Sequence, residues 1–253
     1  MKQSQFYYLL RRGLFSAGSA IIKNGLVMFN KFTTAGLNFP AQGSAEFNGT
    51  SDFIQLNDPF SHTNHTFACW GYLGDSSATR MIFDNREGGT DGLAVFYGSG
   101  DRIFIRINST FIYTTPTYQE EWIFISGTYD GTTHKLYING SLEASASISQ
   151  TIDTARNARI GLRTDVVGDY FKGNLANVAI WNRALSSDEI NSVMWKSYEA
   201  LSGTESNGLQ AWYSLDDITS PAASLANMEQ LATDKDATIE NKAAVTAAIN
   251  ALS

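Results

Sequence analysis

Polar and apolar residues alternate in short segments along most of the chain, beginning at Glu46. The segments are rich in aromatic and β-branched residues, and Gly, Asn or Asp separates one from the next. In order they read AEFNG, DFIQL, TFACWGYL, RMIFD, GLAVFYG, RIFIRI, TFIYTT, EWIFISGTYD, HKLYI, LEASASIS and ARIGLR. A period of two places alternate side chains on one buried face, which is typical of strands. The pattern therefore predicts an all-β fold, a sandwich of two antiparallel sheets.

Two of the turns between these segments have the composition of tight hairpins. Asp130-Gly131 joins WIFISGTY to HKLYI, and Asn139-Gly140 joins HKLYI to LEASA. A type I′ turn needs a positive φ at both central residues, and Asn, Asp and Gly adopt that conformation readily. We therefore expect two consecutive hairpins. A further turn is expected at Lys172-Gly173-Asn174, before the apolar segment that ends on Trp181.

A short helix is predicted directly after that segment, over residues 186–201. Ser186 and Glu189 have the spacing of a capping box, in which each side chain bonds an unpaired amide at the helix start. Apolar residues then follow helical spacing, and Gly203 marks a stop. The single apolar stripe of this helix is expected to lie against the sandwich and to cover one edge or end of the sheets.

The two ends of the chain differ in composition from its centre. Residues 1–23 show little alternation and are interpreted as an N-terminal arm, and residues 24–218 as the sandwich domain. Residues 219–253 are rich in alanine and moderately amphipathic, so they are predicted to form a helical tail.

Charge and cysteine content narrow the function classes. The formal charge of -7 disfavours nucleic acid as a ligand, because phosphate neutralisation needs a basic surface. No apolar run is long enough to span a membrane. Cys69 is the only cysteine, which excludes an intramolecular disulfide, and it is expected to be a buried small side chain.

Several segments together resemble the laminin G-like and pentraxin-like domains of concanavalin A type. They are FNGTSDFIQL, TFACWGYL, EWIFISGTYDGTTHKLYING, RIGLRTD and FKGNLANVAIWNRALSSDEI, and the resemblance covers residues 47–193. It implies a concanavalin A-like jelly roll, in which Trp70, Trp122 and Trp181 are expected to face the core. Fold alone does not fix the function, because lectins, adhesion modules, glycosidases and structural proteins share this sandwich.

The resemblance also implies a calcium site at one rim. In the pentraxin-like pattern two loops supply the carboxylates, and Asp91 and Asp165 stand in those places here. Three departures weaken the pattern: Gly92 replaces an Asn, Arg163 replaces a Glu, and Thr164 replaces a Gln. Calcium needs six to eight oxygen ligands. Neighbouring loops offer further oxygens, from Asp84, Asn85, Asp101 and Asp169.

A sugar site at the same rim would combine an exposed aromatic ring with groups that accept hydrogen bonds from hydroxyls. Tyr97, Asp169 and Tyr170 are the candidate ligand-binding residues. Further aromatics in these loops are Tyr113, Tyr118 and Phe171. The alternative is that these aromatics fill the core or cover the sheets, as aromatics in a sandwich usually do.

Other kinds of site find little support in the sequence. His62 and His65 lie near Asp58, but a third ligand at zinc spacing is missing, so a solvated loop is expected. The E-x-D-x-x-E strand of β-glucan-cleaving enzymes of this fold is absent. No G-x-S-x-G, P-loop or H-E-x-x-H occurs either. We therefore expect no catalytic residues and no enzyme activity.

Two functions fit this description. The first is a structural protein of a virion, made in the host cytoplasm, such as a bacteriophage head decoration, head fibre or tail-associated protein. It would be oligomeric, dock on other virion proteins through residues 1–23 and 219–253, and display the jelly roll for adhesion to glycans or a host surface. The second is a carbohydrate-binding lectin on a bacterial surface or secreted. Arg11 and Arg12 disfavour the second, because they interrupt the apolar part of a possible secretion signal.

Overall fold

The described part of the chain is built mainly from strands. The computed structural model describes residues 44–74, 77–87, 92–148, 152, 154–165 and 168–215. The predicted boundaries at 24 and 218, the N-terminal arm and the helical tail lie outside these residues. The strands are β1 (Ala45–Asn48), β2 (Ile54–Gln55), β3 (His65–Leu73), β4 (Arg80–Asp84), β5 (Leu93–Gly98), β6 (Arg102–Ile107), β7 (Thr110–Tyr113), β8 (Trp122–Tyr129), β9 (Thr133–Ile138), β10 (Ser141–Ser147), β11 (Arg159–Ile160), β12 (Lys172–Trp181) and β13 (Leu209–Tyr213).

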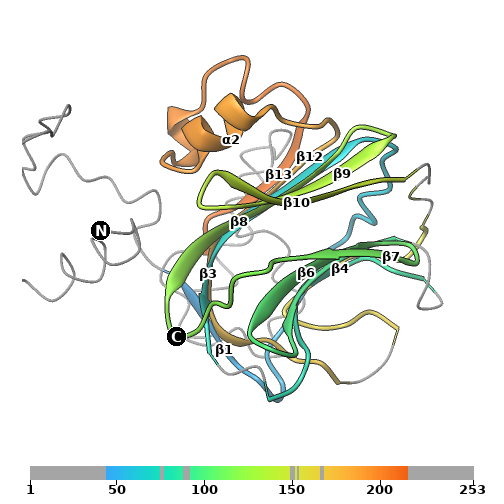
Figure 1. Cartoon of the computed structure of the whole chain (residues 1–253), viewed down its shortest axis with the longest axis vertical. Helices are drawn as coiled ribbons and strands as arrows, with labels where there is room; N and C mark the ends of the chain where they lie inside the picture. The colour runs from blue at the N-terminus through green and yellow to red at the C-terminus, as the bar shows by residue number, and fades with distance from the viewer. Residues whose placement is uncertain are drawn as a thin grey trace, which may run out of the picture.

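These strands form two sheets that lie face to face (Figure 1). Sheet A has the order β1-β12-β3-β8-β9-β10, with β13 also paired to β12. Sheet B has the order β2-β11-β4-β5-β6-β7. Neighbouring strands run antiparallel, for example β3 with β8 and β5 with β6. The predicted all-β sandwich of two antiparallel sheets, a concanavalin A-like jelly roll, is confirmed.

The alternation along each strand decides which side chains enter the space between the sheets. In β6, Ile103, Ile105 and Ile107 are fully buried and belong to the main apolar core, whereas the residues between them face outward and are partly exposed. The predicted burial of Cys69 is confirmed, and this free thiol lies in the same core. Strand β6 therefore sends one set of side chains into the core and leaves the other set on the outer face of sheet B.

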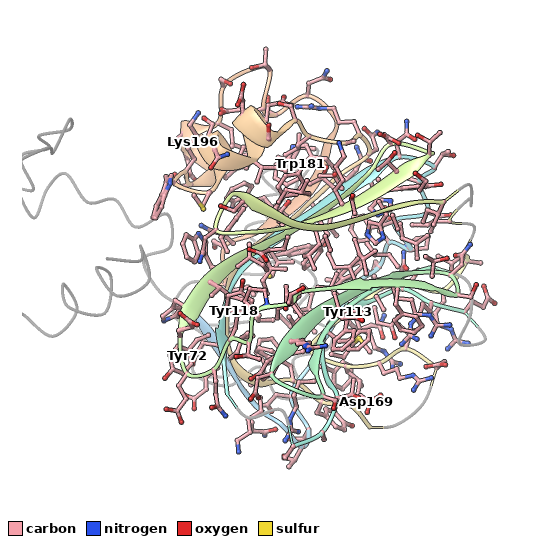
Figure 2. The ribbon with its side chains drawn as sticks, in the orientation of Figure 1. Tyr72, Tyr113, Tyr118, Asp169, Trp181 and Lys196 are labelled. Atoms are coloured by element: carbon pink, nitrogen blue, oxygen red, sulfur yellow. The ribbon has the colours of Figure 1, made fainter. Side chains whose placement is uncertain are left out.

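A second apolar cluster lies on the outer face of sheet A, under the helical segment. Trp70 and Trp181 are buried there with Ile190 and Met194, and Trp122 packs against them partly buried. Figure 2 shows Trp181 and Lys196 on this side of the molecule. Trp70 and Trp181 are core residues as expected and Trp122 is only partly buried, but the expectation that they lie in the inward phase of their strands was wrong. Their phase points them away from the other sheet, and the helical segment covers them instead.

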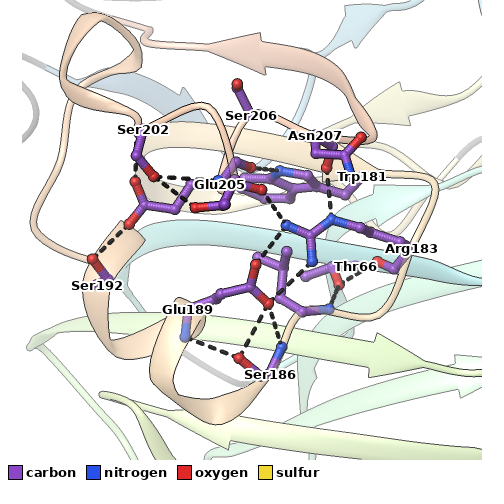
Figure 3. Close-up of polar contacts among 12 residues, drawn as sticks. Thr66, Trp181, Arg183, Ser186, Glu189, Ser192, Ser202, Glu205, Ser206 and Asn207 are labelled. Carbon is purple, nitrogen blue, oxygen red and sulfur yellow. Dashed lines mark hydrogen bonds and ion pairs between the residues drawn. The ribbon is translucent and has the colours of Figure 1, made fainter.

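The capping box predicted at Ser186 and Glu189 is confirmed. The Glu189 amide donates to Ser186 Oγ over 3.2 Å, and the Ser186 amide donates to Glu189 Oε2 over 2.9 Å. Arg183 adds an ion pair to Glu189 at 2.7 Å (Figure 3). These contacts fix the point at which the chain leaves β12 and turns into α2 (Ser187–Val193).

The helix ends earlier than the sequence suggested. Instead of running over residues 186–201, α2 ends at Val193, and a separate 3₁₀ helix η1 (Tyr198–Ala200) follows. Trp70 Nε1 donates to the Met194 carbonyl over 3.0 Å, and the Trp195 ring packs on the Trp70 ring. Tertiary contacts therefore hold the chain in a turn where the periodicity alone favoured more helix. No helix in the described ranges is long and apolar enough to cross a membrane.

Both predicted hairpins are present, and they differ in geometry. Asn139 and Gly140 have φ of 50° and 78°, so the turn between β9 and β10 has the positive φ values expected. At the turn between β8 and β9 only Gly131 has a positive φ, of 92°. The Asp130 carboxylate accepts the amides of Thr132 and Thr133 there, which closes a longer loop than the two-residue turn predicted.

The turn expected at residues 172–174 is instead the start of β12, paired with β1 on one side and β3 on the other. Gly173 has a φ of 136°, and a Cβ atom at this position would lie 2.1 Å from the Tyr72 carbonyl oxygen. Glycine is therefore needed because β3 approaches its backbone closely and its φ is positive, and this requirement looks like a turn signal in the sequence.

Candidate functional site

The loop after β11 brings together Arg163, Asp165 and Asp169. Arg163 binds Asp165 in a bidentate ion pair: its Nε donates to Oδ1 over 2.5 Å, and its Nη2 donates to Oδ2 over 3.0 Å. It also reaches Asp169 Oδ2 at 3.4 Å. Hydrogen bonds from Arg163 lower the pKa of Asp165 below its usual value. The two carboxylates are therefore neighbours around a cation that the protein itself supplies.

This arrangement does not fit calcium among the described residues. Both oxygens of Asp165 are occupied by Arg163, and its positive charge lies where calcium would need to bind. Asp91, the other predicted ligand, lies outside the described residues, so the calcium site stays a prediction. Within the described ranges, no three His, Cys, Asp or Glu side chains are grouped to hold a metal ion.

The other oxygens considered for calcium have structural partners. Asp84 is fully buried and forms an ion pair with Arg86 at 2.7 Å. The Thr164 amide donates to Asp84 Oδ2 over 3.0 Å, so this pair fixes the loop after β11 against the end of β4. The Asn85 side chain is buried and accepts the Leu93 amide over 2.6 Å. These groups are part of the framework that supports the rim.

Tyr97 is fully buried, and this corrects its assignment as an exposed ligand-binding ring. Its hydroxyl donates to the Tyr118 carbonyl over 2.6 Å and lies 2.8 Å from Asp101 Oδ1. Tyr97 faces inward because it is in phase with Leu93 and Val95, both buried in β5. Asp169 and Tyr170 remain partly exposed at the rim, and their ligand-binding role stays a prediction.

The outer face of sheet B carries an array of aromatic rings that the sequence analysis did not assemble. Register pairs Phe96 with Phe104 and Phe104 with Tyr113, and Phe111 lies beside them on β7. The Phe96 and Phe104 rings are stacked, with centroids 5.0 Å apart, and the Tyr113 ring lies 5.3 Å from Phe104. We call these four residues the aromatic face. Figure 2 places Tyr113 on the sheet B side, away from Trp181 and Lys196.

Two of these rings are unusually open to solvent. Phe111 is 48% exposed and Tyr113 is 47% exposed, and the structure has few other exposed large apolar side chains in its described part. Phe96 and Phe104 are partly exposed and form the floor beside them. Contiguous exposed apolar surface on a water-soluble fold marks an interaction site more often than scattered single residues do.

Arginines flank the aromatic face. The Arg106 guanidinium lies over Phe111 at 5.0 Å, and the Arg102 guanidinium lies over Tyr113 at 5.5 Å. Burial, followed by the nearby positive charges of Arg86 and Arg163, lowers the pKa of Arg106. The loop that carries Arg163 also contacts sheet B directly: the Met81 amide donates to the Asp169 carbonyl over 3.0 Å, and Met81 pairs with Phe96 in the register of β4 and β5.

A buried histidine pair lies elsewhere, at the end of β3. Register aligns His65 with Tyr129 and Tyr129 with His134. His65 is 3% exposed and His134 is 0% exposed, and neither imidazole has a hydrogen-bond partner in the described structure. Burial lowers the pKa of each to about 3. The solvated loop expected for His65 was therefore wrong, because His65 is the first residue of a central strand.

Comparisons with known proteins agree with this architecture. A model described as the Concanavalin A-like lectin/glucanases superfamily matches residues 48–191. Among curated proteins, no sequence matches the chain.

Several solved structures share the fold at low sequence identity. A candidate carbohydrate-binding protein from Bacteroides ovatus ATCC 8483 superposes with a TM-score of 0.59 at 17% identity, over 70% of this chain and 52% of that one. The match thus spans about half of that protein. The CBM40 of Ruminococcus gnavus IT-sialidase superposes with a TM-score of 0.52 at 15% identity, over 61% of this chain and 98% of that one. The same CBM40 bound to α2,3-sialyllactose superposes with a TM-score of 0.51 at 15% identity, over 60% of this chain and 96% of that one.

Proposed function

Since the chain belongs to the Concanavalin A-like lectin/glucanases superfamily, we propose that it is a non-catalytic carbohydrate-binding module that holds a glycan on the aromatic face of sheet B. The exposure of Phe111 and Tyr113 carries this proposal. An aromatic ring presents an apolar, electron-rich face, and the C–H side of a sugar ring is its natural partner.

The rim loop supplies the polar half of such a site. Asp169 and Tyr170 are partly exposed in this loop, and carboxylate and hydroxyl oxygens accept hydrogen bonds from sugar hydroxyls. A few polar groups beside an apolar surface are the usual composition of a small-molecule site.

A binding role rather than catalysis is supported by two observations. The sequence lacks the E-x-D-x-x-E strand of glucan-cleaving relatives. The structures with similar fold include a CBM40 and a candidate carbohydrate-binding protein, which support the proposal through fold alone. Incubation with a broad panel of polysaccharides should release no reducing sugar, and turnover of any of them would contradict the non-catalytic proposal.

The experiment that tests the proposed site compares two variants of the full chain on a glycan array, followed by calorimetry with the strongest binder. Replacing Phe111 and Tyr113 together by alanine should weaken binding at least about tenfold, which corresponds to ~1.4 kcal/mol. Leu142→Ala is the matched control, because Leu142 is 54% exposed on β10 of the other sheet. Equal loss in both variants, or no loss in the double variant, would reject this location.

The biological setting of the module remains part of the proposal. A virion component would use residues 1–23 and 219–253 to dock on other virion proteins, whereas a free lectin would act at a bacterial surface or after secretion. No comparison indicates a bacteriophage origin, and the sandwich serves either setting equally. Deleting residues 1–20 or 222–253 should abolish assembly into a particle in the first setting and leave glycan binding intact in the second.

A further inference from the structure

The two cationic residue types are divided between the two sheets. Seven of the eight arginines in the described part of the chain belong to strands or loops of sheet B, and the remaining one, Arg183, follows β12. The seven are Arg80, Arg86, Arg102, Arg106, Arg156, Arg159 and Arg163. The three described lysines, Lys135, Lys172 and Lys196, all belong to sheet A or its helical cover. In a chain of formal charge -7, this places most of the described guanidinium groups in sheet B, the sheet that carries the aromatic face.

Some of these arginines are committed to the fold. Arg86 pairs with the buried Asp84, and Arg163 pairs with Asp165 and Asp169. These pairs neutralise their own charges and hold the rim loop in place.

Arg102 and Arg106 are different, because neither has a carboxylate within ion-pair distance among the described residues. Arg106 Nε donates to the Asn108 carbonyl, and its terminal nitrogens make no hydrogen bond to another described residue. Arg102 Nε has no hydrogen-bond partner there. Both guanidiniums therefore lie over aromatic rings with no carboxylate paired to them in the described structure.

These two arginines bracket the aromatic face along a single strand. Arg102, Phe104 and Arg106 alternate on the outer side of β6. At about 3.4 Å per residue, the backbones of the two arginines lie roughly 14 Å apart, with Phe104 between them. Phe111 and Tyr113 on β7 lie next to them, one under each guanidinium.

Resting on the proposed function, we propose that the glycan bound at the aromatic face is acidic, and that Arg102 and Arg106 bind its carboxylate or sulfate groups while its sugar rings pack on Phe111 and Tyr113. Arginine suits this role because its planar fork matches an oxyanion with two parallel hydrogen bonds and also stacks on aromatic rings. Lysine has no planar fork of this kind. The presence of arginine rather than lysine on the sheet that carries the aromatic face therefore favours recognition of an oxyanion.

The test measures binding of the full chain to matched pairs of glycans by calorimetry at low and moderate salt. The pairs are α2,3-sialyllactose against lactose and oligogalacturonate against a neutral oligosaccharide of equal length, with a heparin oligosaccharide as the sulfated probe. The acidic member of at least one pair, or the heparin probe, should bind at least about tenfold more tightly than a neutral glycan. Its affinity should fall as salt rises. Preference among the acidic probes would identify the acid as carboxylate or sulfate.

The variant Arg102→Gln/Arg106→Gln should lose that preference, and Arg102→Lys/Arg106→Lys should keep only part of it because lysine retains charge without the fork. Lys135→Gln on sheet A, which removes one positive charge from the other sheet, is the control and should bind as the native chain does. Thermal unfolding of each variant confirms that the fold is kept.

The outcomes separate this inference from the proposed function. If neutral and acidic glycans bind equally and the glutamine variant is unaffected, acid recognition is overturned while carbohydrate binding stands. If the glutamine variant loses both kinds of glycan alike, the arginines only support the rings, and acid recognition is likewise overturned. If no glycan of either kind binds, both proposals fail.

Discussion

Arg163 holds Asp165 through both carboxylate oxygens, at 2.5 and 3.0 Å. A guanidinium in this position supplies the positive charge that the pentraxin-like pattern assigns to calcium. The Glu-to-Arg departure noted in the sequence is therefore more than the loss of one ligand. It introduces an internal cation that satisfies a carboxylate predicted to bind calcium.

This pairing leads to a prediction about calcium. Adding millimolar calcium should leave the melting temperature of the native chain unchanged, because the oxygens of Asp165 are already bound. In Arg163→Gln the carboxylates of Asp165 and Asp169 lose their cation, and calcium should then raise the melting temperature. Differential scanning fluorimetry with calcium and with a chelator measures both. A rise in the native chain would show that calcium displaces Arg163 and would restore the predicted site.

The buried histidines predict a fall in stability under mild acid. The pKa of His65 and of His134 is lowered to about 3 in the folded chain, whereas an unfolded histidine titrates near 6.5. Above pH 6.5 both states are neutral and stability is unaffected. Below it the unfolded chain takes up protons that the folded chain excludes, so stability falls by up to ~1.4 kcal/mol per pH unit for each histidine.

Urea denaturation at pH 7, 6 and 5 measures this dependence, in a range where the carboxylates stay largely ionised. His134→Leu removes one of the two fully buried groups and should reduce the slope between pH 6 and 5 by roughly a third to a half, depending on how much His62 contributes. His62, which lies half-buried nearby with Asp58, has a pKa lowered by burial and adds to the slope in both chains. A slope that is unchanged in the variant would show that His134 is not the group that titrates.

The capping box predicts a local effect on α2. Ser186→Ala removes the oxygen that accepts the Glu189 amide and should cost about 1 kcal/mol of stability. Ser187→Ala, one residue further into the helix, removes a hydroxyl with no such role and should change stability by only a few tenths. Chemical denaturation of the two variants gives the comparison, and equal losses would show that the cap contributes nothing specific.

Close strand approach predicts that Gly173 cannot be replaced. A Cβ at this position would meet the Tyr72 carbonyl oxygen at 2.1 Å and would require a φ of 136°. Gly173→Ala should therefore cost roughly 2–4 kcal/mol. Gly203 has no atom within 4 Å of an added Cβ, so Gly203→Ala is the matched control and should be nearly neutral. Similar melting temperatures for both variants would contradict the close approach.

The fold could be predicted from the sequence because two signals agreed along most strands: polar and apolar residues alternate, and turn-forming residues separate one segment from the next. Segments such as RIFIRI separate inward Ile from outward Arg and Phe with little ambiguity. GLAVFYG is apolar in both phases, so nothing in it distinguishes the buried Tyr97 from the partly exposed Phe96. The early end of α2 depends on Trp70, more than a hundred residues away, and no local pattern records that contact.

The site was harder to predict, because its parts meet only through register. Phe111 and Tyr113 lie in one short segment, but their place beside Phe104 depends on how β7 pairs with β6. The sequence signal was the TFIY alternation, which puts Phe111 and Tyr113 in the same phase. Tyr113 was expected among the loop aromatics, and Phe111 was not among the candidate residues. The ion pair between Arg163 and Asp165 joins two loop residues that are two positions apart. This spacing does not by itself predict that their side chains meet.

The apolar cluster under α2 determines which structural changes the intrinsic tryptophan fluorescence of this protein can report. All five tryptophans lie in that cluster or pack against it: Trp70, Trp122, Trp181, Trp195 and Trp212. The outer face of sheet B therefore has no indole, and its only fluorophore among the four residues of the aromatic face is Tyr113. Tryptophan emission should shift when α2 loosens from sheet A, whether or not the inter-sheet core opens. The same emission should stay constant while a ligand fills the aromatic face, so a silent fluorescence titration of this chain is compatible with full occupancy.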